Sequence, residues 1–134
     1  MAKVERFEDL KVWQAAMKIA VDIFAVSETG SLKNDFSTKD QIKRAAFSIS
    51  SNIAEGFEYN NNKEFVRFLK YAKGSAGELR SQLYILNTLG IISQDFYQLK
   101  YLELNSLSSQ ISGFIKYIKN FQENKLINKG RIEG

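Results

Sequence analysis

The 134-residue sequence contains no cysteine, no histidine and no proline. Without cysteine, the chain can form neither a disulfide nor a thiolate centre. Without histidine, it lacks the side chain most often used as a general base near neutral pH and as a transition-metal ligand, so a zinc site would rest on carboxylates alone. The absence of proline removes the residue that most strongly breaks helices and favours long uninterrupted ones.

Apolar runs long enough to cross a bilayer are also missing. Asp22, Asn87 and Ser93 interrupt the longest runs, whereas a membrane-spanning helix needs about 20 mostly apolar residues. The opening residues MAKVERFEDL are charged and lack the apolar segment of a secretory signal. We therefore expect a cytoplasmic protein that does not associate with membranes. Its 44% hydrophobic and 25% charged residues are typical of a single globular domain that buries its own core.

The motifs of common catalytic and metal-binding sites are absent. The segment GSAG (Gly74 to Gly77) has neither the lysine of a phosphate-binding loop nor a preceding strand. A serine nucleophile in this chain would lack its histidine base. The chain also cannot be a helical-bundle ribonuclease of the kind that uses an Arg-x-x-x-x-His pair, because it has no histidine. No EF-hand spacing occurs. We expect neither an enzyme nor a resident cofactor or metal.

Apolar residues recur at helical spacing in four segments, about 7–26, 37–59, 61–89 and 93–125. Because the links between them are short, the pattern predicts an all-α fold, an antiparallel up-down-up-down four-helix bundle. We expect residues 1–126 to form one domain and residues 127–134 to be a disordered tail.

Capping residues indicate where these helices begin and end. Ser37, with Asp40 three residues later, predicts the start of the second helix. Asn61 and Ser93 occupy the corresponding positions before the third and fourth helices. Gly90 is a predicted C-terminal cap of the third helix.

The first helix carries two apolar stripes. One contains Leu10, Trp13, Met17, Ala20, Val21 and Phe24, and the other contains Val12, Ile19, Ile23 and Val26. An ordinary bundle helix needs only one stripe, and a chain of this size cannot bury one helix on both sides. We therefore predict that the chain is a homo-oligomer, with the second stripe at the subunit interface.

Small residues occupy the middle of all four helices. They include Ala15, Ala16, Ser48, Ser51, Gly74, Ser75, Ala76, Gly77, Ser108, Ser109, Ser112 and Gly113. An antiparallel bundle places helix midpoints at one height, so these residues predict a waist where helices approach closely, within the bundle or between subunits. The alternative is that the serines lie on solvated faces.

Asn52 and Glu55 align with Ser48 on one side of the second helix. Three interpretations are open. They can form a seam of hydrogen bonds to Glu78 or Gln82, a solvated surface, or, least favoured, an active site.

The basic residues are unevenly distributed. The net charge of the chain is +4, with a net of −1 over residues 1–60 and +5 over residues 61–134. A candidate nucleic-acid-binding set lies on the third helix: Lys63, Arg67, Lys70, Lys73 and Arg80. Such side chains neutralise phosphates without reading base sequence. The alternative is that they solvate an amphipathic helix, which would leave a structural or protein-interaction module without nucleic-acid affinity.

Three segments together resemble one known family: FEDLKVWQAAMKIA, QIKRAAFSISSNIAEGF and NKEFVRFLKYAKGSAGELRSQL. They are similar to the four-helix-bundle proteins encoded in 23S rRNA intervening sequences, a family related to the accessory variability-determinant protein of diversity-generating retroelements. The resemblance spans roughly residues 7–90. It implies an antiparallel four-helix bundle that assembles as a homopentameric ring. It also implies, as an expectation, a partner that is structured RNA or an RNA–protein complex bound through a basic surface.

Overall fold

The structure is a computed structural model that describes the backbone of residues 4–133 and the side chains of residues 4–121. Within this part of the chain every regular element is helical. Two short 3₁₀ turns, η1 and η2, flank the first helix. The elements are η1 (Phe7–Asp9), α1 (Lys11–Ser27), η2 (Gly30–Leu32), α2 (Phe36–Glu58), α3 (Asn62–Thr88) and α4 (Gln94–Glu133).

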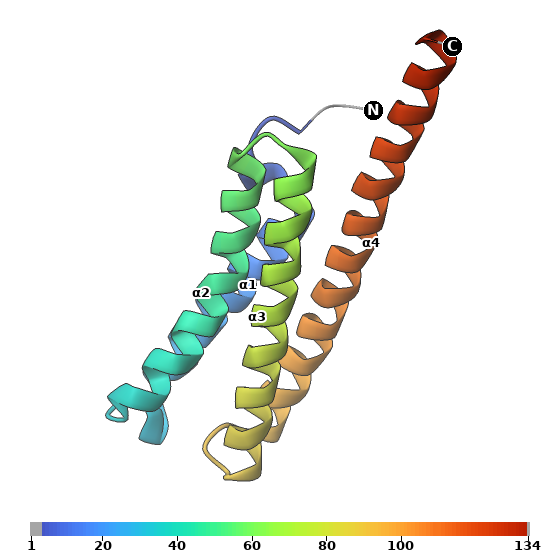
Figure 1. The fold of residues 1–134 in the computed structure, drawn as a ribbon. Helices are drawn as coiled ribbons and strands as arrows, with labels where there is room; N and C mark the ends of the chain where they lie inside the picture. The colour runs from blue at the N-terminus through green and yellow to red at the C-terminus, as the bar shows by residue number, and fades with distance from the viewer. Residues whose placement is uncertain (1–3, 134) are drawn as a thin grey trace.

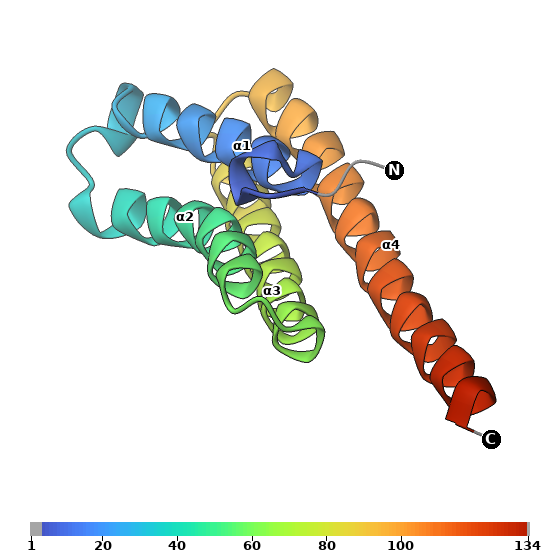
Figure 2. The same ribbon diagram turned by 90° about the horizontal axis from the view of Figure 1, so that it is seen from above.

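The four helices run alternately up and down (Figure 1). Helix α1 packs against α2 and α4, and α3 packs against α2 and α4, so each helix touches its neighbours in the chain. The α1–α4 contact is the smallest of the four. Figure 2 shows α4 diverging from the other three helices towards its C-terminal end. The predicted antiparallel up-down-up-down bundle is confirmed, in an open form.

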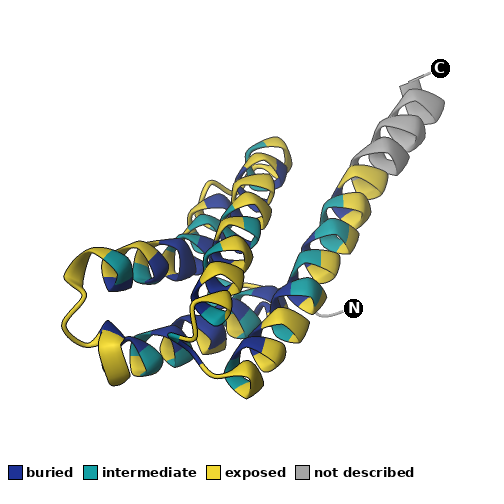
Figure 3. Ribbon diagram, turned by 90° about the horizontal axis from the view of Figure 1, so that it is seen from below, coloured by how far each residue is buried: buried dark blue, intermediate teal, exposed yellow. Residues whose placement is uncertain are grey.

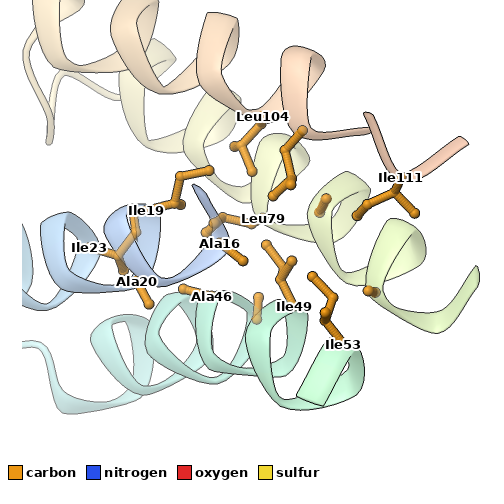
Figure 4. Packing of buried hydrophobic residues seen from close by; sticks show 14 of the residues in the cluster. Ala16, Ile19, Ala20, Ile23, Ala46, Ile49, Ile53, Leu79, Leu104 and Ile111 are labelled. Carbon is orange, nitrogen blue, oxygen red and sulfur yellow. The ribbon is translucent and has the colours of Figure 1, made fainter. Parts of the chain in front are cut away.

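The core is apolar and lies between the helices. In Figure 4, Ile19 and Ile23 of α1 and Ile49 and Ile53 of α2 point into the same space. Leu79, Leu104 and Ile111 close it from α3 and α4, and all seven side chains are at most 1% exposed. Buried positions form a stripe on each helix and exposed positions lie outside (Figure 3). This is the arrangement that helical spacing of apolar residues predicts.

Helix boundaries follow the capping residues, with one correction. The Asn61 side chain accepts a hydrogen bond from the backbone N–H of Glu64, and Ser93 Oγ accepts one from Phe96 N–H. Gly90, at φ +73°, ends α3 as predicted. The second helix begins earlier than Ser37 indicates, because Asp35 is its cap and accepts from Thr38 N–H at 3.1 Å. A carboxylate preceding the helix therefore replaces the predicted serine.

The second stripe of α1 lies in the core, and the first stripe is only partly exposed, because Leu10 and Ala20 are buried as well. Val12, Ile19 and Ile23 are 6%, 1% and 0% exposed, so they lie in the core of the single chain and not at a subunit surface; Val26 is half-buried. The exposed positions are Met17 (39%) and Val21 (58%) from the other stripe. Periodicity reveals both stripes, but which of them faces the core depends on where α2 and α4 lie. Three of the four residues assigned to an oligomer interface are therefore covered within one chain, and whether the chain assembles stays a prediction.

Hydrogen bonds explain the polar middle of α2. Asn52 Nδ2 donates to the backbone oxygen of Ser48 at 2.7 Å and to its hydroxyl at 3.0 Å. Ser48 Oγ in turn lies 2.9 Å from Ser75 Oγ on α3. Of the three interpretations, the hydrogen-bonded seam applies to Asn52, but it reaches Ser75 instead of Glu78 or Gln82. Glu55 lies on the exposed surface.

Close approach of helices occurs at Gly56 of α2. A Cβ there would stand 2.6 Å from Phe68 Cβ and 3.2 Å from Phe65 Cδ1, both on α3. By contrast, a Cβ on Gly74, Gly77 or Gly113 would meet nothing within 4 Å. The prediction that these three glycines allow close packing is therefore wrong within one bundle, and for contacts between subunits it stays a prediction.

The prediction of a disordered tail covers residues 127–134. The side chains of residues 127–133 and the whole of Gly134 lie outside the described part of the chain. The disordered tail stays a prediction.

We expect Gly56→Ala and Gly74→Ala to change the free energy of unfolding in opposite directions. The methyl group at Gly56 collides with Phe68 Cβ, which cannot rotate away, and overpacking of this kind costs about 1–3 kcal/mol. At exposed Gly74, alanine improves helix propensity and stabilises by about 0.5–1 kcal/mol. Urea denaturation followed by circular dichroism measures both. Equal effects of the two substitutions would contradict the assigned packing.

Candidate nucleic-acid interface

All five basic residues predicted to bind nucleic acid are exposed on α3. Lys63 and Lys70 lie two helical turns apart, and Lys73 and Arg80 follow at the same interval on an adjacent strip. Within the described residues, Lys63, Lys70, Lys73 and Arg80 form no ion pair with a carboxylate. Their charges are therefore available to an anionic partner.

Arg67 differs from the other four. Its guanidinium forms a 2.8 Å ion pair with Glu64 and lies over the rings of Phe68 and Tyr71, 5.2 and 5.9 Å from their centroids. The cation is therefore partly neutralised and held against aromatic faces. The structure thus places Arg67 on the same helix as the predicted set but engages it locally.

Helix α4 extends the basic surface. Three contacts define its antiparallel register against α3: Phe65 with Phe114, Arg80 with Asn105, and Tyr84 with Tyr97. In this register, exposed Lys116 and Lys119 of α4 lie level with the first turns of α3. We call the resulting surface the α3–α4 basic face; it comprises Lys63, Lys70, Lys73, Arg80, Lys116 and Lys119.

The nearby carboxylates on these two helices are turned to other partners. Glu64 pairs with Arg67, and Glu103 accepts from Lys100 on the α1 side. Glu78 lies beside Gln82, whose amide is 3.4 Å away. Because no described carboxylate pairs with a lysine or arginine of the α3–α4 basic face, its positive charges are not cancelled locally.

A groove that sequence reasoning missed adjoins this face. Gly77, Arg80 and Ser81 of α3 line it with three tyrosines, Tyr84, Tyr97 and Tyr101, and with Ile85. The spacing of Tyr97 and Tyr101, one turn apart, and of Arg80 and Tyr84 is visible in the sequence. Only the pairing of α3 with α4 brings the two pairs together.

A buried lysine forms the main charged cluster between α1 and α4. Lys100 is 1% exposed and donates to Asp22 and to Glu103, the latter at 2.9 Å. Lys18 joins from the surface, 3.0 Å from Asp22 and 3.3 Å from Glu103. Two carboxylates thus compensate one buried ammonium group, the condition under which a buried charge is tolerated. The cluster crosses the smallest helix–helix contact of the bundle.

This cluster alters the ionisation of its members. Burial alone would raise the pKa of Asp22, but the hydrogen bonds from Lys100 and Lys18 outweigh it and hold the pKa below its ordinary value. The hydrogen bond to Asp22 is the main reason that the pKa of Lys18 is raised. Both shifts favour the charged forms and hence the ion pairs.

Two other kinds of feature are absent from the described residues. These residues contain no group of three or more acidic side chains placed to hold a metal ion. Their helices also include none that is long and apolar enough to cross a membrane.

Comparison with known proteins agrees with the four-helix architecture and the sequence resemblance. The family described as 23S rRNA-intervening sequence protein matches residues 8–113, which covers α1, α2, α3 and the first half of α4. The chain belongs to this family. The match includes every α3 residue of the basic face and the tyrosine groove, whereas Lys116 and Lys119 lie beyond it. No curated protein matches the chain significantly.

A solved structure supports the same fold. A protein of unknown function from the S23 ribosomal protein family of Bacteroides thetaiotaomicron is similar, with a TM-score of 0.71 and 23% sequence identity. The match covers 78% of this chain and 95% of that protein. At this identity the likeness shows the fold alone.

The lowered pKa of Asp22 predicts acid sensitivity. A carboxyl whose pKa is lower in the folded state stabilises the fold above its ordinary pKa of about 3.9 and loses that contribution as the pH falls through the folded value. We therefore expect Asp22→Asn to be less stable than the parent protein at neutral pH and to lose less stability on acidification. Urea denaturation at a series of pH values tests this, with exposed Asp40→Asn as the control. Parallel stability curves for the parent and Asp22→Asn would contradict the role of the cluster.

Proposed function

We propose that this 23S rRNA-intervening sequence protein is a non-enzymatic homopentamer that binds structured RNA, or an RNA–protein complex, through the α3–α4 basic face. One observation carries the proposal: six exposed cations lie on two adjacent helices, and no described carboxylate pairs with them. Phosphate groups repeat along a nucleic acid at short intervals, and each lysine or arginine that meets one releases a bound counterion. A surface of this kind holds a backbone without selecting a base sequence.

Repetition of the face in an assembly would strengthen binding. A single chain offers only a few phosphate contacts, and each contact is weak at physiological salt. Identical subunits arranged in a ring present several such faces to one RNA, so that after the first contact the others form at high effective concentration. The family resemblance supplies the number five for this proposal.

The core position of Val12, Ile19 and Ile23 moves the proposed subunit contact to the outer surface of α1. Met17 and Val21 are exposed there, and Phe24 meets Phe47 of α2 with ring centroids 4.8 Å apart. Phe47 is 51% exposed. Contiguous apolar side chains of this kind are typical of protein–protein contacts. We assign this patch, Met17, Val21, Phe24 and Phe47, to contact with a second copy of the chain.

Removing two cations from the α3–α4 basic face should weaken RNA binding. We expect Lys70→Glu with Lys73→Glu to lower affinity for a structured RNA and to reduce the slope of log affinity against log salt by about 0.7–0.9 for each phosphate that the variant no longer neutralises. The matched control is Lys11→Glu with Lys33→Glu, which alters net charge equally on exposed positions elsewhere. Fluorescence anisotropy at several salt concentrations measures both.

Parent protein that does not bind RNA at low salt would overturn the proposal. The remaining candidate would then be the alternative, a structural or protein-interaction module without nucleic-acid affinity. Equal losses of affinity in the two double variants would show that only total charge matters and would remove the assignment to α3.

The proposed subunit contact has its own test. A charge at Val21, which is 58% exposed in the single chain, cannot be buried against another subunit without a large desolvation cost. We therefore expect Val21→Lys to give a monomer of unchanged helix content, while Asp40→Lys remains assembled. Light scattering coupled to size exclusion measures the mass. A parent protein that is itself monomeric would disprove the pentamer, and a pentameric Val21→Lys would disprove this surface.

A further inference from the structure

The groove between α3 and α4 is small and open to solvent. Its volume is about 280 Å³, slightly below the usual range of small-molecule pockets, about 300–1,000 Å³. It is open to solvent along one side. The open side admits a single aromatic ring system inserted edge-first. The volume is too small for an extended ligand or a packed helix.

Three tyrosine rings form the inner surface of the groove. Tyr97 is 8% exposed and lies at the base, whereas Tyr84 and Tyr101 are 62% and 38% exposed. Tyr97 meets Tyr84 edge-on, with centroids 6.0 Å apart and planes at 79°, and it lies 6.0 Å from Tyr101 at 41°. Tyr97 therefore supports two outer rings that are not stacked on each other. The exposed parts of Tyr84 and Tyr101 remain available to a ligand.

The charge at the rim is positive. Arg80 bonds to the neutral side chain of Asn105 across the two helices, so its guanidinium is positioned while its charge is not neutralised. Lys73 lies two turns before Arg80 on the same strip of α3. Within the described residues no carboxylate lines the groove. An anionic ligand with an attached aromatic ring matches this combination of cation and tyrosine faces.

Gly77 provides room at the groove wall. It lies inside α3, where glycine weakens a helix, and a Cβ there would meet no atom of another helix within 4 Å. Nothing within the bundle therefore requires glycine. A methyl group would extend into the groove beside the tyrosines.

We propose that the groove stacks one unpaired nucleobase of the bound RNA against Tyr84 and Tyr101, while Arg80 contacts an adjoining phosphate. This inference rests on the proposed function and narrows it to RNA with single-stranded segments. Bases within a duplex are stacked on one another and cannot enter, whereas bases of loops and ends can rotate out onto aromatic side chains. Stacking of this kind tolerates any base because every base has a π face.

The test uses an RNA oligonucleotide carrying one 2-aminopurine, either single-stranded or annealed to its complement. We expect the parent protein to quench 2-aminopurine fluorescence only in the single strand and to bind that strand more tightly. Tyr84→Ala and Tyr101→Ala should each weaken single-strand binding about tenfold and abolish quenching, with duplex binding unchanged. Tyr84→Phe keeps the ring and should behave like the parent.

Two further variants separate a ligand groove from a structural role. Gly77→Ala should raise the thermal midpoint of unfolding, because it improves the helix, and yet weaken single-strand binding. Tyr117→Ala removes an exposed tyrosine of α4 outside the groove and should alter neither binding nor quenching. A variant that merely unfolds would lose duplex binding and helix content together.

The outcomes distinguish this inference from the proposed function. Salt-dependent RNA binding with equal affinity for single strand and duplex, and no effect of Tyr84→Ala, would overturn the nucleobase groove and leave phosphate binding intact. No binding of either RNA would overturn both. Loss of assembly in Tyr84→Ala, seen by light scattering, would identify the groove as a subunit contact and also overturn the inference.

Discussion

The contact between α2 and α3 is the constraint on which the rest of the structure depends. Gly56 lets Phe68 approach so closely that no Cβ fits between them, and Ser48 and Ser75 join the two helices further along. Small residues permit this approach, and the hydrogen bonds satisfy the polar atoms that it covers. The contact determines the rotation of α3 and therefore which of its faces remains for solvent and partners.

The free surface of α3 follows from that rotation. With Leu69, Ala72, Ala76, Leu79 and Leu83 turned inwards, the lysines and Arg80 point away from the core, and the antiparallel register of α4 adds two more cations and the tyrosines. Charge and aromatic area thus come together on one surface, where Arg80 and Tyr84 also contact α4. Gly74, Gly77 and Gly113 support the same view. Glycine weakens a helix, and in one bundle none of the three permits a close approach of another helix.

Between α1 and α4, in contrast, a charged side chain is buried and paired. There, Lys100 is buried and balanced by Asp22 and Glu103. The pairs Lys100–Asp22 and Lys18–Glu103 cross between the helices, so this contact is specified by ion pairs as well as apolar packing. Breaking such a pair is costly because the remaining charge stays buried without a partner. The α4 helix is therefore positioned by an electrostatic cluster on its α1 side while its α3 side carries the groove.

The sequence by itself determined the fold class, most helix ends and the presence of a basic strip on α3, because apolar spacing and capping residues act locally. It also revealed the two stripes of α1 and the small residues of four helices. Only the tertiary structure decided which stripe is core, that Gly56 and not Gly74 or Gly77 packs closely, that Lys100 is buried, and that Arg80 stands beside three tyrosines. Those facts depend on the rotation and register of neighbouring helices, which no single helix encodes in its own pattern.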